Sequence, residues 1–600
     1  MGTGFSADTP IRVSHFGISS VISIVDDLLL ERLREYYRRQ FDMPYNRIHR
    51  YEEHGRSRRI TAYLDTVQEI VRRKIEAMKN LPFGHDNDKT KYFELLPDDS
   101  PLKQSFLHWQ KMPNGEEKDR QESALTEAMH PGSIDVNIMT KLDRPHIGKD
   151  GMPLGEEFTD AKTALKGYAE STLQSALVFS AGLNQGLFNY MSRFRDFYRN
   201  ELGETKKKIV IKVSDFRSAI IQGKILAKRG LEVHEFRIES GLNCGGHAFA
   251  SNGYLLPAIL KEFKEKRHQL AEECRPLVKR FYETVGWRYD EKLGAEGPLV
   301  TVQGGIGTHG EAERLKDDFG ADRTGWATPF LLVPEATAVD ESTRTLLSNA
   351  KEEDLYVSGA SPLGVQFNTV KGSGSLRWTA RQAERGRPGS PCPKGFLVSN
   401  TEFTESMICT ASREYQKAKL EEIENEPLFD RARKAEERER TLEKTCLCDH
   451  LGNSALVSLG VREEFDSPQS VCPGPNIAWF NRLYTLREMV DHIYGRGMSL
   501  VSPERPHMFA KEVIMYVDHV DRLIKRCTGS IQELRQLREF KRNLESGIDL
   551  CLEIAEGQPR RDENLASIRP VVKEQQTRLR DLFGVFEASL LPQSIEAGAA

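Results

Sequence analysis

The sequence predicts an α/β protein whose N-terminal half is a (β/α)8 (TIM) barrel extending from about residue 11 to residue 330. Between residues 133 and 330, short apolar runs typical of buried strands alternate with segments of helical spacing. Such alternation is typical of parallel strands joined by helical crossovers, and it excludes sandwiches and helical bundles here. Glycine pairs follow two of the apolar runs, at the position where a barrel builds its active-site face.

The first elements are less regular than the later ones. Residues 11–24 are rich in Val, Ile, Ser and Gly, and residues 26–41 are charged and of helical composition. We therefore expect a strand followed by a helix. Residues 47–130 are polar and mostly helical or irregular, which predicts a helical insertion in the barrel.

The regular part of the barrel follows this insertion. The expected strands cover 134–139, 176–181, 208–213, 231–238, 299–302 and 321–330. The expected helices between them cover 160–174, 187–202, 218–229, 254–284 and 310–318. With residues 11–24 this makes seven strand positions, and the insertion has room for an eighth. Counting strands leaves a closed barrel and an open sheet as alternatives.

Composition divides the chain into three parts. These are a barrel domain (1–371, with the insertion at about 47–130), a Cys-containing connecting region (372–480) and a mainly helical C-terminal region (481–600). The start of the connecting region is rich in Gly, Arg, Ser and Pro, which marks a loop. Beyond it, helices are expected at 414–445, 485–493, 507–526, 530–555 and 565–590.

Charge and hydropathy limit the partners. The chain has 600 residues and 85 Lys plus Arg against 89 Asp plus Glu, so no global field favours nucleic acid or anionic lipid. A small-molecule substrate fits this balance better. No apolar run reaches the ~18 residues that cross a bilayer, and the first twenty residues lack a signal-peptide pattern. We expect a cytoplasmic protein that binds neither membrane nor nucleic acid, with its nine cysteines as reduced thiols or ligands.

Two segments at the end of the barrel are typical of a phosphate site. Gly304, Gly305 and Ile306 follow a predicted strand, and Ala327 and Thr328 follow the next one. The last two strands of such barrels commonly hold a phosphate. Glycine allows backbone N–H groups to approach phosphate oxygens, and a following helix N-terminus adds a favourable dipole.

These segments resemble the nitronate monooxygenase family, formerly 2-nitropropane dioxygenases, and the related flavin-dependent enoyl reductases. The family's Gly-Gly-His signature is matched by Gly245, Gly246 and His247, and its Gly-Gly-Ile signature by residues 304–306. Gly320, Ala321 and Asp322 match its last strand, with Ala327 where the family has Gly. Glu335 and residues 358–362 echo its closing segment. The resemblance covers roughly half of the chain.

The resemblance implies an FMN cofactor over the barrel mouth, with His247 beside it as the acid or base. The residues that it places at the cofactor are Asn137, Gly245, Gly246, Gly304, Gly305, Ile306, Ala327 and Thr328. His15 is a second histidine that can face the pocket, whereas His309 is expected at a helix start. Lys212 lies within a predicted strand, and alternation leaves open whether it points into the barrel mouth or extends its charged end to solvent. Cys244 is expected to pack beside the glycine pair.

Five of the nine cysteines fall in about eighty residues of the connecting region: Cys392, Cys409, Cys446, Cys448 and Cys472. Thiolates suit zinc or an iron–sulfur cluster, so these residues are candidate metal ligands. Their spacings contain no Cys-x2-Cys pair, and the alternative is a set of buried thiols in a helical core. The resemblance gives no support to a metal here.

Three functions compete. The first is an FMN-dependent oxidoreductase of nitronate monooxygenase-like type, with a small organic substrate and either dioxygen or a nicotinamide as second substrate. The second is a reductase in which an iron–sulfur cluster of the connecting region supplies electrons to the flavin. The third is a non-catalytic ligand-binding or scaffold barrel. Apolar stripes on the C-terminal helices are compatible with a homo-oligomer or with packing inside the chain.

Overall fold

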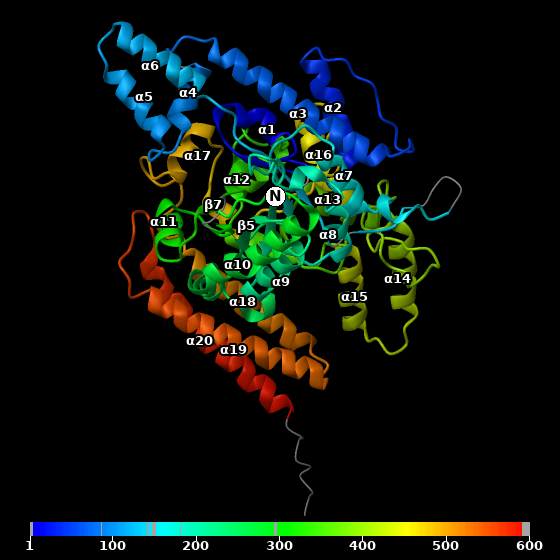
Figure 1. Cartoon of the computed structure of the whole chain (residues 1–600). Coiled ribbons are helices and arrows are strands. Elements are labelled where there is room, and N and C mark those ends of the chain that lie inside the picture. The colour runs from blue at the N-terminus through cyan, green and yellow to red at the C-terminus, as the bar shows by residue number, and fades with distance from the viewer. Residues whose placement is uncertain are drawn as a thin grey trace, which may run out of the picture.

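The computed structural model describes residues 4–85, 87–140, 143–146, 152–180, 182–292 and 297–590 (Figure 1). Its centre is a seven-stranded sheet in which every neighbouring pair is parallel and the strands follow one another in chain order. The strands are β1 (Ser20–Ser23), β2 (Ile134–Ile138), β3 (Ala176–Phe179), β4 (Lys208–Val213), β5 (Val233–Glu239), β6 (Leu299–Gln303) and β7 (Arg323–Gly325). The predicted parallel α/β architecture is therefore confirmed.

Crossover helices cover the outer face of the sheet. They are α2 (Asp27–Gln40), α7 (Asp160–Ala169), α8 (Gln185–Met191), α9 (Phe216–Ala227), α10 (Leu256–Val285) and α11 (His309–Asp317). The main hydrophobic core lies between these helices and the strands. A small apolar cluster of Ala176, Val178 and Val210 lies on the opposite face. Since residues of all seven strands line one cavity on that face, the sheet is curled around it.

The curled sheet is not shown to close into an eight-stranded barrel. Among the described residues it has seven strands, and no ladder joins β7 to β1. The strand predicted at 11–24 is only partly correct, because α1 (Thr9–Val13) and the 3-10 turn η1 (Ser14–Phe16) precede β1. Pro10 in the first turn of α1 has a φ that suits a helix start and has no N–H for a strand ladder.

The N-terminal segment lies across the open side of the sheet. Thr9 donates its hydroxyl to Ala336 O at 2.7 Å, and Ala338 N donates to Phe5 O at 2.9 Å. Residues of α1 and η1 line the same cavity as the strands. This segment therefore borders the cavity together with the strands.

The predicted insertion contains four helices. They are α3 (Gly55–Lys79), α4 (Asp88–Leu95), α5 (Pro101–Lys111) and α6 (Glu116–Glu127). Figure 1 shows α4, α5 and α6 together at one edge of the molecule. In contrast, α3 packs against α2 and α7 and places Ile60, Leu64 and Val67 in the main core. The first helix of the insertion is thus part of the central fold.

The connecting region is mainly helical. It follows the antiparallel pair β8 (Leu355–Ser358) and β9 (Phe367–Val370) and the helix α12 (Glu341–Asn349). Its helices are α13 (Gly374–Glu384), α14 (Arg413–Asn425), α15 (Arg431–Glu443) and α16 (Leu447–Ser458). The single helix predicted at 414–445 is wrong, because Pro427 interrupts it and Asp430 caps a second helix.

The C-terminal helices are α17 (Leu486–Ile493), α18 (Met508–Arg526), α19 (Ile531–Ile554) and α20 (Ile568–Leu590), close to the predicted bounds. Figure 1 shows α18, α19 and α20 beside one another next to α9 and α10. Val513 and Tyr516 of α18 belong to the same core as Leu242 and Phe263 of the barrel region. The C-terminal helices therefore pack directly on the sheet domain. Within the described part of the chain, no helix is both long and apolar enough to span a membrane.

Candidate functional site

A cavity of about 2000 Å³ occupies the concave face of the sheet. Its lining includes the loops at the carboxyl ends of β5, β6 and β7, which carry Gly245, Gly246, Gly304, Gly305, Ile306, Ala327 and Thr328. The structure thus brings together the three segments that the sequence singled out. Seven of the eight predicted cofactor residues line one space.

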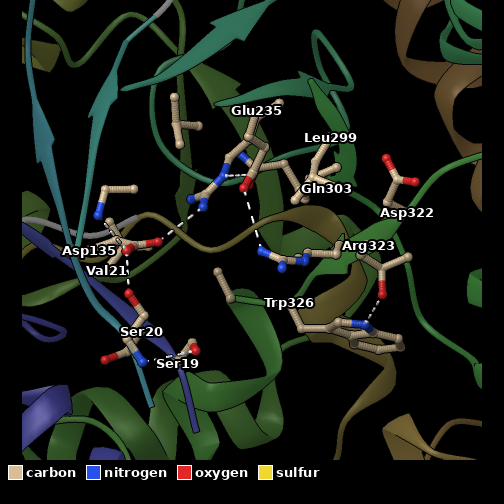
Figure 2. A pocket seen from close by; sticks show the side chains of 18 of the residues that line it. Ser19, Ser20, Val21, Asp135, Glu235, Leu299, Gln303, Asp322, Arg323 and Trp326 are labelled. Atoms are coloured by element: carbon tan, nitrogen blue, oxygen red, sulfur yellow. Dashed lines mark hydrogen bonds and ion pairs between the residues drawn. The ribbon is translucent and has the colours of Figure 1, made fainter. Parts of the chain in front are cut away.

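The interior of the sheet is charged on its β5–β7 side (Figure 2). Arg237 donates to Glu235 at 2.5 Å, and its other end lies 3.3 Å from Asp135 on β2. Arg323 points toward Glu235, with 3.8 Å between charged atoms. Burial lowers the pKa of Arg237, but the interactions with Glu235 and Asp135 are stronger, so the pKa is raised overall. These paired charges make the interior polar and close to neutral overall.

A second ion pair lies nearer the carboxyl ends of the strands. Lys212 Nζ is 2.5 Å from Glu239 Oε2, and Gln303 donates to Glu239 Oε1 at 2.9 Å. Burial raises the pKa of Glu239, but Lys212 reverses this effect and holds it below the usual value. Lys212 therefore faces the interior in a fixed ion pair. Burial raises the pKa of the neighbouring Cys244 thiol, which keeps it protonated and weakly nucleophilic.

The loop after β6 has the backbone expected of a phosphate cradle. Gly304 and Gly305 have φ of 98° and 78°, in the left-handed region that favours glycine. A Cβ on Gly305 would lie 2.3 Å from Asn243 Nδ2, so a larger residue cannot fit without moving this loop. Thr308 then caps α11 by accepting from Glu311 N at 3.2 Å. The N-terminus of α11, a helix of nine residues, thus follows the glycine pair.

Arg505, from the C-terminal region, fixes this loop. It donates to Gly305 O at 2.6 Å and to Glu311 Oε1 at 2.7 Å. Gly307 N donates to the other Glu311 oxygen at 2.7 Å. The side chains of Arg505 and Glu311 are only 5% and 1% exposed. Burial raises the pKa of the Glu311 carboxyl, but the interaction with Arg505 is stronger, so this pKa is lowered overall.

Two more side chains hold carbonyl oxygens of the same loop. Asn476 donates to Ile306 O at 3.0 Å, and His492 Nε2 donates to Gly307 O at 2.9 Å. His492 Nδ1 accepts from Leu500 N, and burial lowers its pKa to about 4, so this ring is neutral. A trans peptide directs a carbonyl and the following N–H to opposite sides. Since the Gly305 carbonyl faces Arg505, the Ile306 N–H faces away from it.

The loops after β5 and β7 meet at residues 472–474. Gly474 N donates to Thr328 Oγ1 at 2.9 Å, and Gly246 N donates to Cys472 O at 3.2 Å. A Cβ on Gly245 would lie 2.7 Å from the Cys472 carbonyl oxygen, which explains the glycine there. Cys472 itself lines the cavity. Residues 472–474 thus join the Gly245–Gly246 motif and the Ala327–Thr328 segment into one wall.

His247 lies at the edge of this wall. Its Nε2 is 2.8 Å from Ser361 Oγ, and its ring packs edge-on against Phe367 of β9. Gly246 is fixed in turn by Asn368, which donates its backbone N–H to Gly246 O at 2.9 Å. The ring is half-buried and is held by the small β8–β9 sheet. The structure thus places His247 directly after two cavity residues, with a hydroxyl partner on one ring nitrogen.

The structure places the other predicted polar residues in different environments. Asn137 is half-buried on β2 and shares the concave face with Asp135 two residues earlier. His309 begins α11, lines the cavity and lies with Nδ1 2.9 Å from Ile493 O. His15 is buried in η1, and burial with nearby Lys74 and Lys91 lowers its pKa to about 3. His15 is therefore neutral and poorly suited to take up a proton.

Several residues that hold the site were not found from the sequence. Besides Arg505, Asn476 and His492, they include Glu512 of α18. Its carboxyl accepts from Ser240 Oγ at 2.5 Å and from Leu256 N at 2.9 Å, which ties both ends of the β5–α10 loop to α18. Burial raises the pKa of Glu512 to about 7. The signal in the sequence was only a lone acidic residue in an apolar helix stripe.

The cysteines predicted as metal ligands do not all lie together. Cys392 and Cys409 are in side-chain contact, and Cys446 and Cys448 lie in the same neighbourhood. Cys472 is separate, beside Gly246. Burial raises the pKa of Cys446 and Cys448. In the part of the chain that the structure describes, no three His, Cys, Asp or Glu residues are arranged to hold a metal ion.

Comparisons with known proteins give little further guidance. No protein-family model matches the chain, and no curated protein matches its sequence. Among solved structures, a match is the enoyl reductase domain of MlnA from the macrolactin biosynthesis cluster of Bacillus amyloliquefaciens. It has 15% sequence identity and a TM-score of 0.34, and covers 66% of this chain and 86% of that chain. At this level the likeness identifies neither a family nor an activity.

Proposed function

We propose that the chain is an FMN-dependent oxidoreductase of nitronate monooxygenase-like type, built on a (β/α)8-like fold. It acts on a small organic substrate, with dioxygen or a nicotinamide as the second substrate. The observation that carries the proposal is the convergence of the Gly245–Gly246, Gly304–Gly305 and Ala327–Thr328 segments around one cavity. These segments come from three neighbouring strands, at the end of a parallel sheet where such folds bind ligands.

The residues present fit the phosphate end of FMN. Gly304 and Gly305 bring the backbone to the cavity without a Cβ in the way, and the Ile306 N–H faces away from Arg505. Thr328 adds a hydroxyl, and the N-terminus of α11 adds a favourable dipole. The cavity is larger than the ~300–1,000 Å³ of typical ligand sites, so cofactor and substrate have room together.

FMN would supply the electron or hydride transfer, and the protein would supply orientation and proton transfer. His247 would remove a proton from an acidic substrate carbon, or donate one to a carbon that becomes basic. Ser361 would fix the orientation of the ring through its contact with Nε2. The ion pair of Lys212 and Glu239 would add a fixed polar surface to the cavity.

A pair of glycine substitutions tests the cradle. Gly305→Ala should weaken FMN binding by about tenfold or more, because the new Cβ meets Asn243 and displaces the loop, at a cost of at least ~1.4 kcal/mol. Gly320→Ala is the matched control: its φ is also positive, at 69°, but its nearest neighbour is 3.8 Å away. FMN titration followed by fluorescence measures both. Equal affinities for the two variants would contradict a cradle at Gly305.

A further inference from the structure

Two cysteine side chains meet outside the cavity, in the segment between β9 and α14. The Cys409 thiol forms a side-chain hydrogen bond with the Cys392 sulfur, and the Gly395 N–H donates to the same sulfur. Cys409 is buried, whereas Cys392 is half-buried and in part accessible to solvent. The sulfurs are therefore in contact, with one reachable from outside.

The backbone around the pair is held firmly. Ser390 N donates to Ala411 O at 2.9 Å and Arg413 N donates to Ser390 O at 2.8 Å, so the stretches that carry the two cysteines run side by side. Arg50 donates to Pro393 O and Lys394 O, each at 3.1 Å. Lys394 in turn lies 2.6 Å from buried Asp26, the N-cap residue of α2. These contacts keep the two sulfurs close.

The conformation of Cys392 is itself unusual. Its φ is 55°, in the left-handed region that residues with a side chain rarely adopt. Such a conformation persists only where the surroundings enforce it, and it is found more often at functional positions.

We propose that Cys392 and Cys409 form a reversible disulfide when hydrogen peroxide oxidises them. The Cys392 sulfur attacks one peroxide oxygen, the O–O bond breaks, and water leaves after protonation, giving a sulfenic acid. Cys409 then attacks that sulfur: the S–S bond forms, the S–O bond breaks and a second water leaves. Two electrons pass from the thiols to the peroxide. This inference does not depend on the proposed flavin.

Peptide mapping after oxidation tests the proposal. The full-length protein is treated with hydrogen peroxide, its remaining thiols are alkylated, and it is digested with trypsin. Cys392, Cys409 and the Cys446–Cys448 pair fall in separate peptides, 386–394, 395–413 and 445–462. We expect the first two to be linked, two of the nine thiols to be lost, and a thiol reductant to restore both.

Three variants sharpen the test. Cys409→Ser should stop the reaction at a Cys392 sulfenic acid, which dimedone traps. Cys392→Ser should leave peptide 395–413 unlinked, and Cys274→Ser, on α10, should not change the linkage. A disulfide to Cys446 or Cys448, no thiol loss, or stoichiometric zinc or iron bound to these cysteines would each overturn the proposal. Circular dichroism of the variants checks that they fold.

Discussion

Replacing His247 by alanine should lower turnover by about 10²–10⁴-fold while the protein keeps its full flavin content. Turnover should fall without loss of flavin because the proposed phosphate cradle consists of backbone groups after later strands. These groups are fixed by Arg505 and Asn476. The imidazole does not contribute to those contacts. Its Nε2 instead contacts the Ser361 hydroxyl.

Two control variants accompany His247→Ala. Ser361→Ala removes the partner of Nε2 but leaves the ring, so its loss of turnover should be smaller and its pH profile shifted. His309→Ala removes a histidine that lines the cavity, and should leave turnover within a few-fold of wild type. Flavin content is measured for each. Unchanged turnover of His247→Ala at full occupancy would show that His247 is structural.

Replacing Arg505 by alanine should lower the free energy of unfolding by about 3–5 kcal/mol, because it leaves Glu311 charged, buried and without its partner. It also releases the Gly305 carbonyl, so flavin retention should fall with stability. Urea denaturation measures the first effect and flavin content the second.

The matched control for Arg505 is an exposed ion pair. Arg482 lies 2.8 Å from Glu488, but the two side chains are 51% and 39% exposed. Arg482→Ala should therefore cost no more than about 1 kcal/mol. If Arg505→Ala proves too unstable to purify, Arg505→Lys keeps the charge and loses the two-point contact, and should show a smaller loss. An Arg505→Ala variant as stable as Arg482→Ala would contradict this role.

The strands β2 to β6 could be predicted because each is a short apolar run with one face in the main core. β4, at Lys208–Val213, has its predicted bounds. The first strand was harder to predict, because residues 11–24 have strand-like composition whereas Pro10 favours a helix start. The position of the N-terminal segment beside the sheet could not be predicted, because its contacts with Ala336 and Ala338 join parts of the chain that share no local pattern.

The motifs of the candidate site could be predicted because glycines at strand ends are local signals. The residues that hold those loops could not. Arg505 reaches Gly305 across 200 positions of the sequence, and Glu512 reaches Ser240 across 272. A single arginine or glutamate in a helical region carries no pattern that identifies its partner. The prediction for the cysteines failed in the opposite way. Cys472 was grouped with the other four cysteines because it is near them in the sequence, but in the fold it lies apart from them, beside Gly246.

The most direct test of the central claim is the absorption spectrum of the protein purified from cells, with mass analysis of the cofactor released by heat. The account predicts flavin bands and a released molecule with the mass of FMN, in a ratio close to one per chain. Reconstitution with FMN should restore the bands after the cofactor is removed. A protein that neither carries nor takes up FMN, or that releases an adenylated cofactor instead, would contradict the account.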